Sequence, residues 1–238
     1  MKYVSSYSAD NASVNYGKHP SVFQKLKQQN NNIVPANCNC DVMNNTIKYA
    51  LKAFSFDVES FVIKCYNSFS SSAKISDDLR EFSEFLQMEY RELLRHVPTR
   101  WLSLMPTIDR LLLCWRVLKS YFASQGEDDV ADFIWRSFSC GEDDLSVIPE
   151  WTLYFVHNVM TIFDETIKCL ESNTTTATEV HGIMVRVQDK LQERRCDKLY
   201  GSAATKLFQG DDVSTADRQK FEREVDNFLG RCLTYLQK

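Results

Sequence analysis

Residues 104–122, LMPTIDRLLLCWRVLKSYF, carry the clearest helical pattern of the chain. Their large apolar side chains recur in steps of four and three, a spacing that places them on one face of an α-helix. These positions are Leu104, Ile108, Leu111, Trp115, Leu118 and Phe122. Because Leu102 and Leu112 widen this face, the pattern predicts one long helix that is buried on more than one side.

The same period continues on both sides of this stretch. Upstream, apolar stripes run from Ile47 to Phe54, from Val58 to Phe69 and from Leu79 to Leu93. Downstream, the pattern predicts helices over 130–138 and 151–170, and a loop over 202–212. Two further helices are expected to begin at Thr176, where Thr-Ala-Thr-Glu fits a capping box, and at Ser214. Such stripes are typical of a buried core, so we expect a helical bundle.

The first forty residues have a different pattern. Residues 3–8 form a short run rich in β-branched and aromatic side chains, 21–29 have helical spacing, and 33–38 can form a second strand. A strand, a short helix and a strand within forty residues predict one βαβ unit with parallel strands. The expected fold is therefore mainly α, with a small βαβ unit at the N-terminus.

The bulk composition agrees with a folded chain. With 238 residues, 44% hydrophobic and 25% charged, the chain can bury a core as one large domain or two small ones. Only seven glycines and five prolines argue against a turn-rich all-β fold. The eight cysteines are scattered through helical patterns, so we expect free thiols. Without an apolar stretch of signal-peptide or membrane-span type, a nuclear or cytoplasmic location is expected, not secretion and not a membrane.

The charge is unevenly distributed. Residues 1–123 carry 15 basic and 11 acidic side chains, and residues 124–238 carry 13 and 21. Since an acidic surface repels phosphate, any nucleic acid is expected to bind to the first half.

Common enzyme motifs are missing from the sequence. It has no Gly-rich phosphate loop, no Gly-x-Ser-x-Gly and no His-Glu-x-x-His. The four histidines, at 19, 96, 157 and 181, are far apart, and we expect each to lie at the surface or to cap a helix.

Two short runs carry most of the functional information. Asp10 follows directly on the first expected strand, within Ala-Asp-Asn-Ala-Ser at 9–13. The run Val-Pro-Thr-Arg-Trp at 97–101 stands directly ahead of the long helical stripe. Between them come the helix at 21–29, the strand at 33–38, Cys-Asn-Cys-Asp at 38–41 and a helix at 43–55. This order of segments resembles the catalytic domain of hAT-type DNA transposases, and most of all the transposon-derived, zinc-finger-linked hAT-like proteins of animals.

The resemblance implies an architecture and three site residues. Residues 1–42 would be a partial RNase H-like segment, and 43–238 would correspond to the all-helical insertion domain of the family. Asp10 would be the second metal-binding carboxylate, Trp101 would stack on a flipped base and Arg100 would contact the adjacent phosphate. Alternatively, Trp101 packs against the start of the helix and Arg100 is simply solvated.

The departures from the family pattern are equally informative. Cys38-x-x-Asp41 stands where the family has Cys-x-x-His, and Cys-x-Cys alone is too short for a zinc site, so no metal ligands are predicted. We expect the strands that precede Asp10 in the family fold to be missing, and nothing around Glu222 or Glu224 identifies the final catalytic glutamate. One carboxylate cannot hold two Mg²⁺ ions, so Asp10 is expected to be vestigial, with no cofactor and no transposase activity.

Two functions remain open from the sequence. The first is a truncated or domesticated hAT transposase-like protein, catalytically inactive, that retains DNA binding through its first half or binds protein, including itself. The alternative is a helical protein–protein interaction module with no nucleic-acid role.

Overall fold

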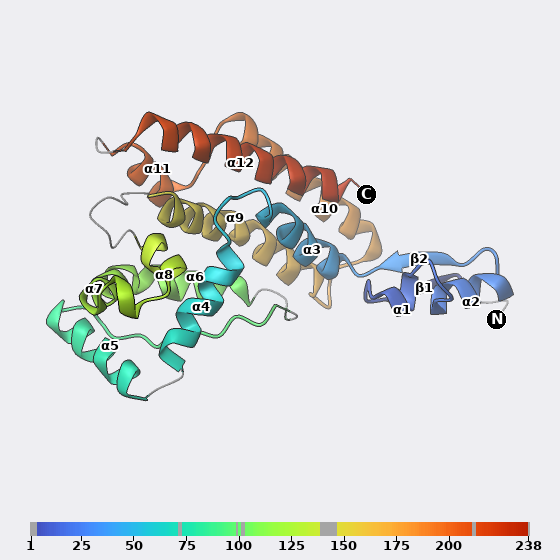
Figure 1. Cartoon of the computed structure of the whole chain (residues 1–238). Helices are drawn as coiled ribbons and strands as arrows, with labels where there is room; N and C mark the ends of the chain where they lie inside the picture. The colour runs from blue at the N-terminus through green and yellow to red at the C-terminus, as the bar shows by residue number, and fades with distance from the viewer. Residues whose placement is uncertain are drawn as a thin grey trace.

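A computed structural model describes residues 4–70, 73–98, 100, 103–138, 147–210 and 213–237. Within these residues, helices account for 70% of the structure, as twelve α-helices and one short 3-10 helix. The same part of the chain contains a two-stranded parallel sheet near the N-terminus (Figure 1). The expected fold, mainly helical with a small parallel strand pair, is confirmed.

The N-terminal unit has the predicted order of elements. It runs through β1 (Ser6–Ala9), α1 (Ser13–Tyr16), α2 (Val22–Gln29) and β2 (Val34–Asn37), and the strands pair in parallel from Ser6 opposite Val34 to Ala9 opposite Asn37. The Tyr16 hydroxyl lies 2.9 Å from the carbonyl oxygen of Tyr7 and 3.1 Å from that of Ala36. This one side chain therefore bridges the two strands from the helical side.

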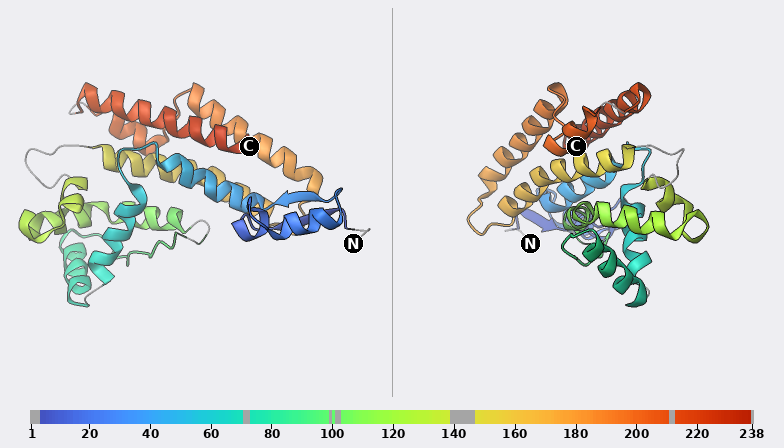
Figure 2. Two further views of the ribbon diagram at one scale, coloured as in Figure 1. Left: turned by 45° about the vertical axis from the view of Figure 1, so that its right-hand side comes forward. Right: turned by 90° about the vertical axis from the view of Figure 1, so that its left-hand side faces the viewer.

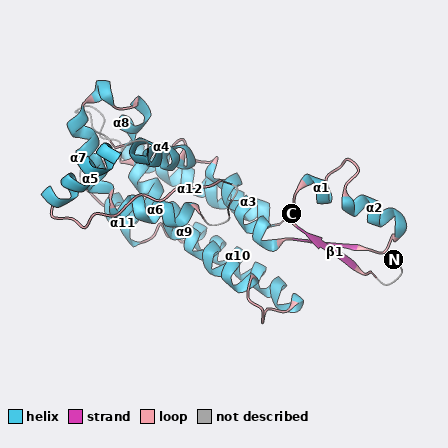
Figure 3. Cartoon of the chain, turned by 90° about the horizontal axis from the view of Figure 1, so that it is seen from below, coloured by secondary structure: helices cyan, strands magenta, loops and turns pink. Residues whose placement is uncertain are grey.

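This unit lies at one end of the molecule, beyond the first turn of α3 (Asn39–Leu51), as Figure 3 shows. Within residues 4–37 only Ser21 and Ile33 are buried. A two-stranded sheet with so little buried apolar surface is not stable alone. Its order therefore depends on the direct connection from β2 into α3.

Helix α9 (Ile148–Leu170) is the centre of the helical body. It packs against α3, α6 (Leu104–Leu113), α10 (Ala177–Cys196), α11 (Ser202–Phe208) and α12 (Thr215–Leu236), as Figures 1 and 2 show. Its side chains Trp151, Phe155 and Phe163 are almost completely buried. Both predicted caps are present, because the Glu179 carboxylate accepts from Thr176 N at 2.7 Å and the Ser214 hydroxyl accepts from Asp217 N at 3.0 Å.

A second group of helices forms the other side of the body. It consists of α4 (Val58–Ser70), α5 (Ala73–Phe85), α7 (Trp115–Gln125), the 3-10 helix Glu127–Asp129 and α8 (Asp132–Ser137). Its core is aromatic: the rings of Phe61, Trp115, Phe122 and Phe138 lie 4.5–6.0 Å apart in successive pairs. Edge-to-face and offset ring contacts of this kind add to the stabilisation from burial.

The prediction of one long helix over 104–122 is wrong. The chain bends at Cys114 (φ −93°, ψ 2°), which separates α6 from α7. The helical period survives the bend because Cys114 N donates to Arg110 O at 3.2 Å and Leu118 N donates to Cys114 O at 2.9 Å. The bend lets α6 pack against α9 while α7 packs against α5, so each half buries its apolar face on a different helix.

Two other predictions are wrong in their local structure. The stripe through Leu86 and Leu93 does not continue as a helix, since α5 ends at Phe85 and residues 89–97 are irregular. Conversely, the loop expected over 202–212 contains α11, which begins after Gly201 (φ +91°). Its packing on α9 stabilises a helix that is too short to form alone.

The end of α5 is built on an exposed residue with an unfavourable backbone conformation. Gln87 has φ +54°, and Met88 N donates to Ser83 O at 2.9 Å in the pattern of a Schellman cap, where glycine is preferred. Gln87→Gly is therefore expected to raise the free energy of unfolding by about 0.5–1 kcal/mol. Urea denaturation measures the change, and a lower midpoint would contradict it.

The expectations about cysteines and membrane spans can also be compared with the structure of the described residues. Seven cysteines in this part of the chain are free thiols, as predicted, and Cys140 lies outside it. None of the helices found there combines the length and the apolar character that a membrane crossing requires.

Candidate functional site

Asp10 lies directly after β1, at the carboxyl end of the parallel strand pair, where the sequence placed it. Its carboxylate accepts a hydrogen bond from Ala12 N at 3.3 Å and another from the side-chain amide of Asn15. These contacts lie in the turn between β1 and α1. Its observed role is therefore to hold a turn.

A second carboxylate lies at the same end of the sheet. Asp41, in the first turn of α3, accepts from Asn11 N at 2.8 Å, and the Asn11 side-chain amide donates to Cys38 O at 3.3 Å. Both acids are thus engaged with neighbouring amides. The described residues contain no group of three or more His, Cys, Asp or Glu side chains that could hold a metal ion. The donor set does not fit the Mg²⁺ pair that the family resemblance implies.

The Cys-Asn-Cys-Asp run opens α3 instead of ending a strand. Cys38 precedes the first turn of the helix, and Cys40 and Asp41 lie within that turn. Burial, with the neighbouring Cys38 as the next cause, raises the pKa of the Cys40 thiol to about 11. At neutral pH this thiol is protonated, and it packs as a small apolar side chain of the core.

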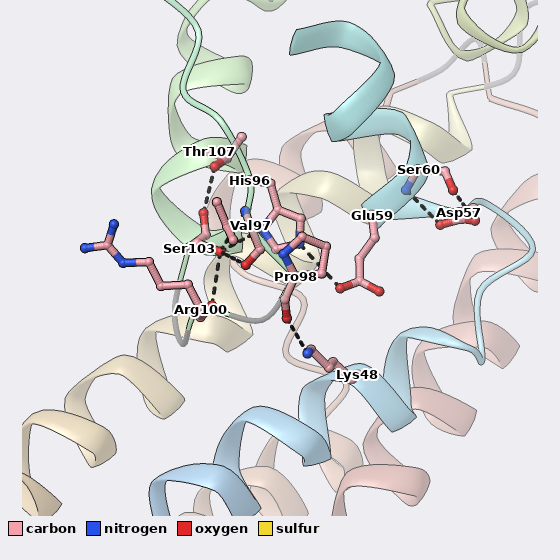
Figure 4. A network of polar contacts seen from close by, with 10 residues as sticks. All are labelled: Lys48, Asp57, Glu59, Ser60, His96, Val97, Pro98, Arg100, Ser103 and Thr107. Atoms are coloured by element: carbon pink, nitrogen blue, oxygen red, sulfur yellow. Dashed lines mark hydrogen bonds and ion pairs between the residues drawn. The ribbon is translucent and has the colours of Figure 1, made fainter. Parts of the chain in front are cut away.

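Arg100 stands on an irregular segment that joins α5 to α6. We call residues 88–98, together with Arg100 and Ser103, the strap. The Arg100 side chain is exposed, and Figure 4 shows its guanidinium pointing away from the polar network around it. Thr99 and Trp101 lie outside the described residues, so the stacking role of Trp101 stays a prediction.

A buried polar network fixes the strap. The Ser103 hydroxyl lies 2.9 Å from His96 Nδ1, accepts from Val97 N at 3.2 Å and lies 2.8 Å from Val97 O. On the other side of the imidazole, His96 Nε2 is 3.5 Å from Glu59 Oε1 on α4. Lys48 on α3 donates to the carbonyl oxygen of Pro98. Side chains of two helices, α3 and α4, therefore contact this segment, and Ser103 and His96 link it internally (Figure 4).

This network contradicts the expected placement of His96. The sequence analysis placed it at the surface or at a helix cap, whereas only 6% of it is exposed. Glu59 and Ser103 give no signal of their partnership in the sequence, because 37 and 7 positions separate them from His96 and no motif relates them. Only the packing of α4 against the strap brings the three side chains together.

The network is arranged to support the loop and not to activate a nucleophile. The Ser103 hydroxyl is committed to the carbonyls of Val97 and Arg100, at 2.8 and 3.1 Å. The cavity beside His96 and Glu59 has a volume of about 20 Å³, which is room for one water molecule. An organic substrate does not fit there, so this cluster positions the exposed strap.

Comparisons with known proteins give no further guide: no family model matches the chain, and neither a curated protein nor a solved structure matches it.

Proposed function

We propose that this chain is a catalytically inactive hAT transposase-like protein that binds DNA through its first half. The supporting observations are the parallel strand pair with Asp10 at its carboxyl end and the helical body that follows directly from β2. The one that carries DNA binding is the exposed Arg100, on a strap that Lys48 of α3 and Glu59 of α4 contact. A strap that is already held by its neighbours loses little backbone conformational entropy when its arginine meets a phosphate.

The absence of catalysis in this proposal rests on the site chemistry. Asp10 already accepts two hydrogen bonds in the α1 turn, and Asp41 is engaged by Asn11. Phosphoryl transfer with two metal ions needs carboxylates that are free to bridge the ions. An arrangement in which these carboxylates already accept hydrogen bonds from amide groups suits a binding protein.

A helical protein–protein interaction module is the second candidate. It is favoured by the exposed apolar side chain of Phe85, which is 83% accessible at the end of α5, and by the partly exposed Leu94 and Leu113. Large apolar groups on a surface are more often contact points for protein than for nucleic acid.

The dependence of DNA affinity on salt separates the two candidates. If Arg100 neutralises one phosphate, binding of a DNA duplex should weaken steeply with salt, and Arg100→Ala should reduce the slope of log K against log[salt] by about 1. Fluorescence anisotropy with a labelled duplex, over about 50 to 200 mM salt, measures both quantities.

The matched control is Arg186→Ala, which removes an exposed arginine from α10 in the acidic half. This variant should bind as the unaltered chain does. Absence of DNA binding at low salt, or equal losses in the two variants, would exclude the DNA-binding role of Arg100 and favour the interaction module.

A further inference from the structure

One concave site lies in the half of the molecule that the charge count made least suitable for anions. It is a cleft of about 410 Å³ between the C-terminal end of α10 and the middle of α12. We call it the α10–α12 cleft. Its polar lining consists chiefly of Arg194, Arg195, Lys198, Tyr200, Glu222 and Arg223.

The cations of the cleft outnumber its anions. Arg194, Arg195, Lys198 and Arg223 face two carboxylates, Glu222 and Asp226. The bidentate pair of Arg195 with Asp226, at 2.7 and 2.8 Å, uses one carboxylate. The pair of Lys198 with Glu222, at 3.5 Å, uses the other. Among the described residues, Arg194 and Arg223 have no ion-pair partner.

Arg194 is the most informative of these groups. It is half-buried, and its guanidinium donates to the neutral side chain of Asn158 at 2.5 Å. Among the described residues no carboxylate forms an ion pair with it, and burial, opposed by the neighbouring carboxylate of Glu193, lowers its pKa. A desolvated cation is costly unless an anion compensates it. The free N–H groups of Arg194 are therefore suited to receive an anion from solution.

Arg223 supplies the second uncompensated charge. It lies on the exposed side of α12, and within the described part of the chain it has no ion-pair partner. It lies one position after Glu222, and both residues line the same cleft. A ligand bound by Arg194, which is half-buried, and by Arg223, which is exposed, would meet two planar guanidinium donors.

The wall of the cleft is apolar. Val225 and Leu229 line it together with the ring of Tyr200, which is 7% exposed. Burial, followed by the neighbouring Glu222, raises the pKa of Tyr200 to about 12, so its hydroxyl is a neutral donor at physiological pH. The cleft thus offers an apolar surface beside a pair of cations.

The backbone at the rim is held in an uncommon conformation. Lys198 has φ +51° at the second residue after the end of α10, where glycine would be favoured. A lysine there keeps an ammonium group at the edge of the cleft in spite of the backbone cost.

From this arrangement we propose that the α10–α12 cleft binds a phosphate monoester with a small organic body. A dianionic phosphate would be bound by the guanidinium groups of Arg194 and Arg223, neither of which has an ion-pair partner among the described residues, and the organic part would rest on Val225, Leu229 and Tyr200. The volume of the cleft falls in the range of small-molecule sites. This inference is independent of the proposed DNA binding, which involves the opposite half of the chain.

The test uses the full chain and phenyl phosphate as the probe, with calorimetry for affinity and thermal unfolding as a second readout. Phenyl phosphate should bind and raise the melting temperature, and inorganic phosphate should bind more weakly. Arg194→Gln and Arg223→Gln should each weaken phenyl phosphate binding about tenfold or more, because each removes a charge-assisted hydrogen bond. Arg186→Gln, an exposed arginine on α10 outside the cleft, should leave it unchanged.

The design separates failure to fold from failure to bind. Arg194→Gln keeps an amide donor for Asn158, and Arg223 is exposed, so both variants should melt close to the unaltered chain. Absence of phenyl phosphate binding, equal affinity for inorganic phosphate, or equal losses in all three variants would overturn the proposal. A DNA duplex whose binding depends on Arg194 and Arg223, without binding of phenyl phosphate, would also overturn it.

Discussion

Phe155→Ala is expected to lower the free energy of unfolding by about 3–5 kcal/mol. Phe155 is completely buried in α9, and its ring lies 5.6 Å from that of Phe228 and 6.1–6.2 Å from those of Phe54 and Phe221. Phe155 therefore links α9 to α12 and to the segment that follows α3. Truncation removes the apolar contacts and leaves a cavity in the middle of the bundle, which the surrounding helices can fill only in part.

Equilibrium urea denaturation followed by circular dichroism measures this loss. Phe85→Ala is the matched control, because it makes the same chemical change at a side chain that is 83% exposed, and it should change stability by no more than about 0.5 kcal/mol. Similar effects of the two substitutions would mean that α9 is not the centre of the core.

Ser103→Ala should have the second-largest effect, a loss of about 1–3 kcal/mol. The substitution removes the hydroxyl that accepts from Val97 N at 3.2 Å and contacts His96 Nδ1 at 2.9 Å. Since His96 is almost completely buried, its ring nitrogen cannot regain a partner from bulk water. The protein should therefore lose stability, and the strap between α5 and α6 should become more mobile.

Hydrogen exchange resolved by residue tests the local part of this prediction. The amide of Val97 should exchange faster in Ser103→Ala, and the amides of α12 should keep their relative protection. Ser68→Ala, at a half-buried serine of α4 whose hydroxyl donates to Lys64 O at 3.0 Å, serves as the control. Unchanged exchange at Val97 would show that Ser103 does not hold the strap.

The local pattern was sufficient for most helices and for the strand pair. The apolar stripes of α4, α9, α10 and α12 lie where the spacing predicts them, and the caps at Thr176 and Ser214 begin their helices. The parallel β1–β2 pair also follows from the run of β-branched and aromatic residues at 3–8, the second short strand and the helical segment between them. These features depend on neighbours within a few positions, which the sequence displays directly.

The candidate sites were less predictable. Asp10 was placed correctly at the strand end, but its use in the α1 turn depends on Asn15, and Arg100 needs the support of Ser103 and His96. The net negative charge of the second half gave no indication of the cations that line the α10–α12 cleft. A sum of charges does not reveal that the guanidinium of Arg194 donates to the side-chain amide of Asn158.

The sequence by itself determined the helical periods, the βαβ order of the first forty residues and the positions of the main caps, because these arise from local sterics and hydrogen bonding. Only the tertiary structure decided the bend at Cys114, the helix α11, the burial of His96 and the composition of the α10–α12 cleft. Each of these depends on contacts between segments distant in the chain, where the gain from packing exceeds the local preference of the backbone.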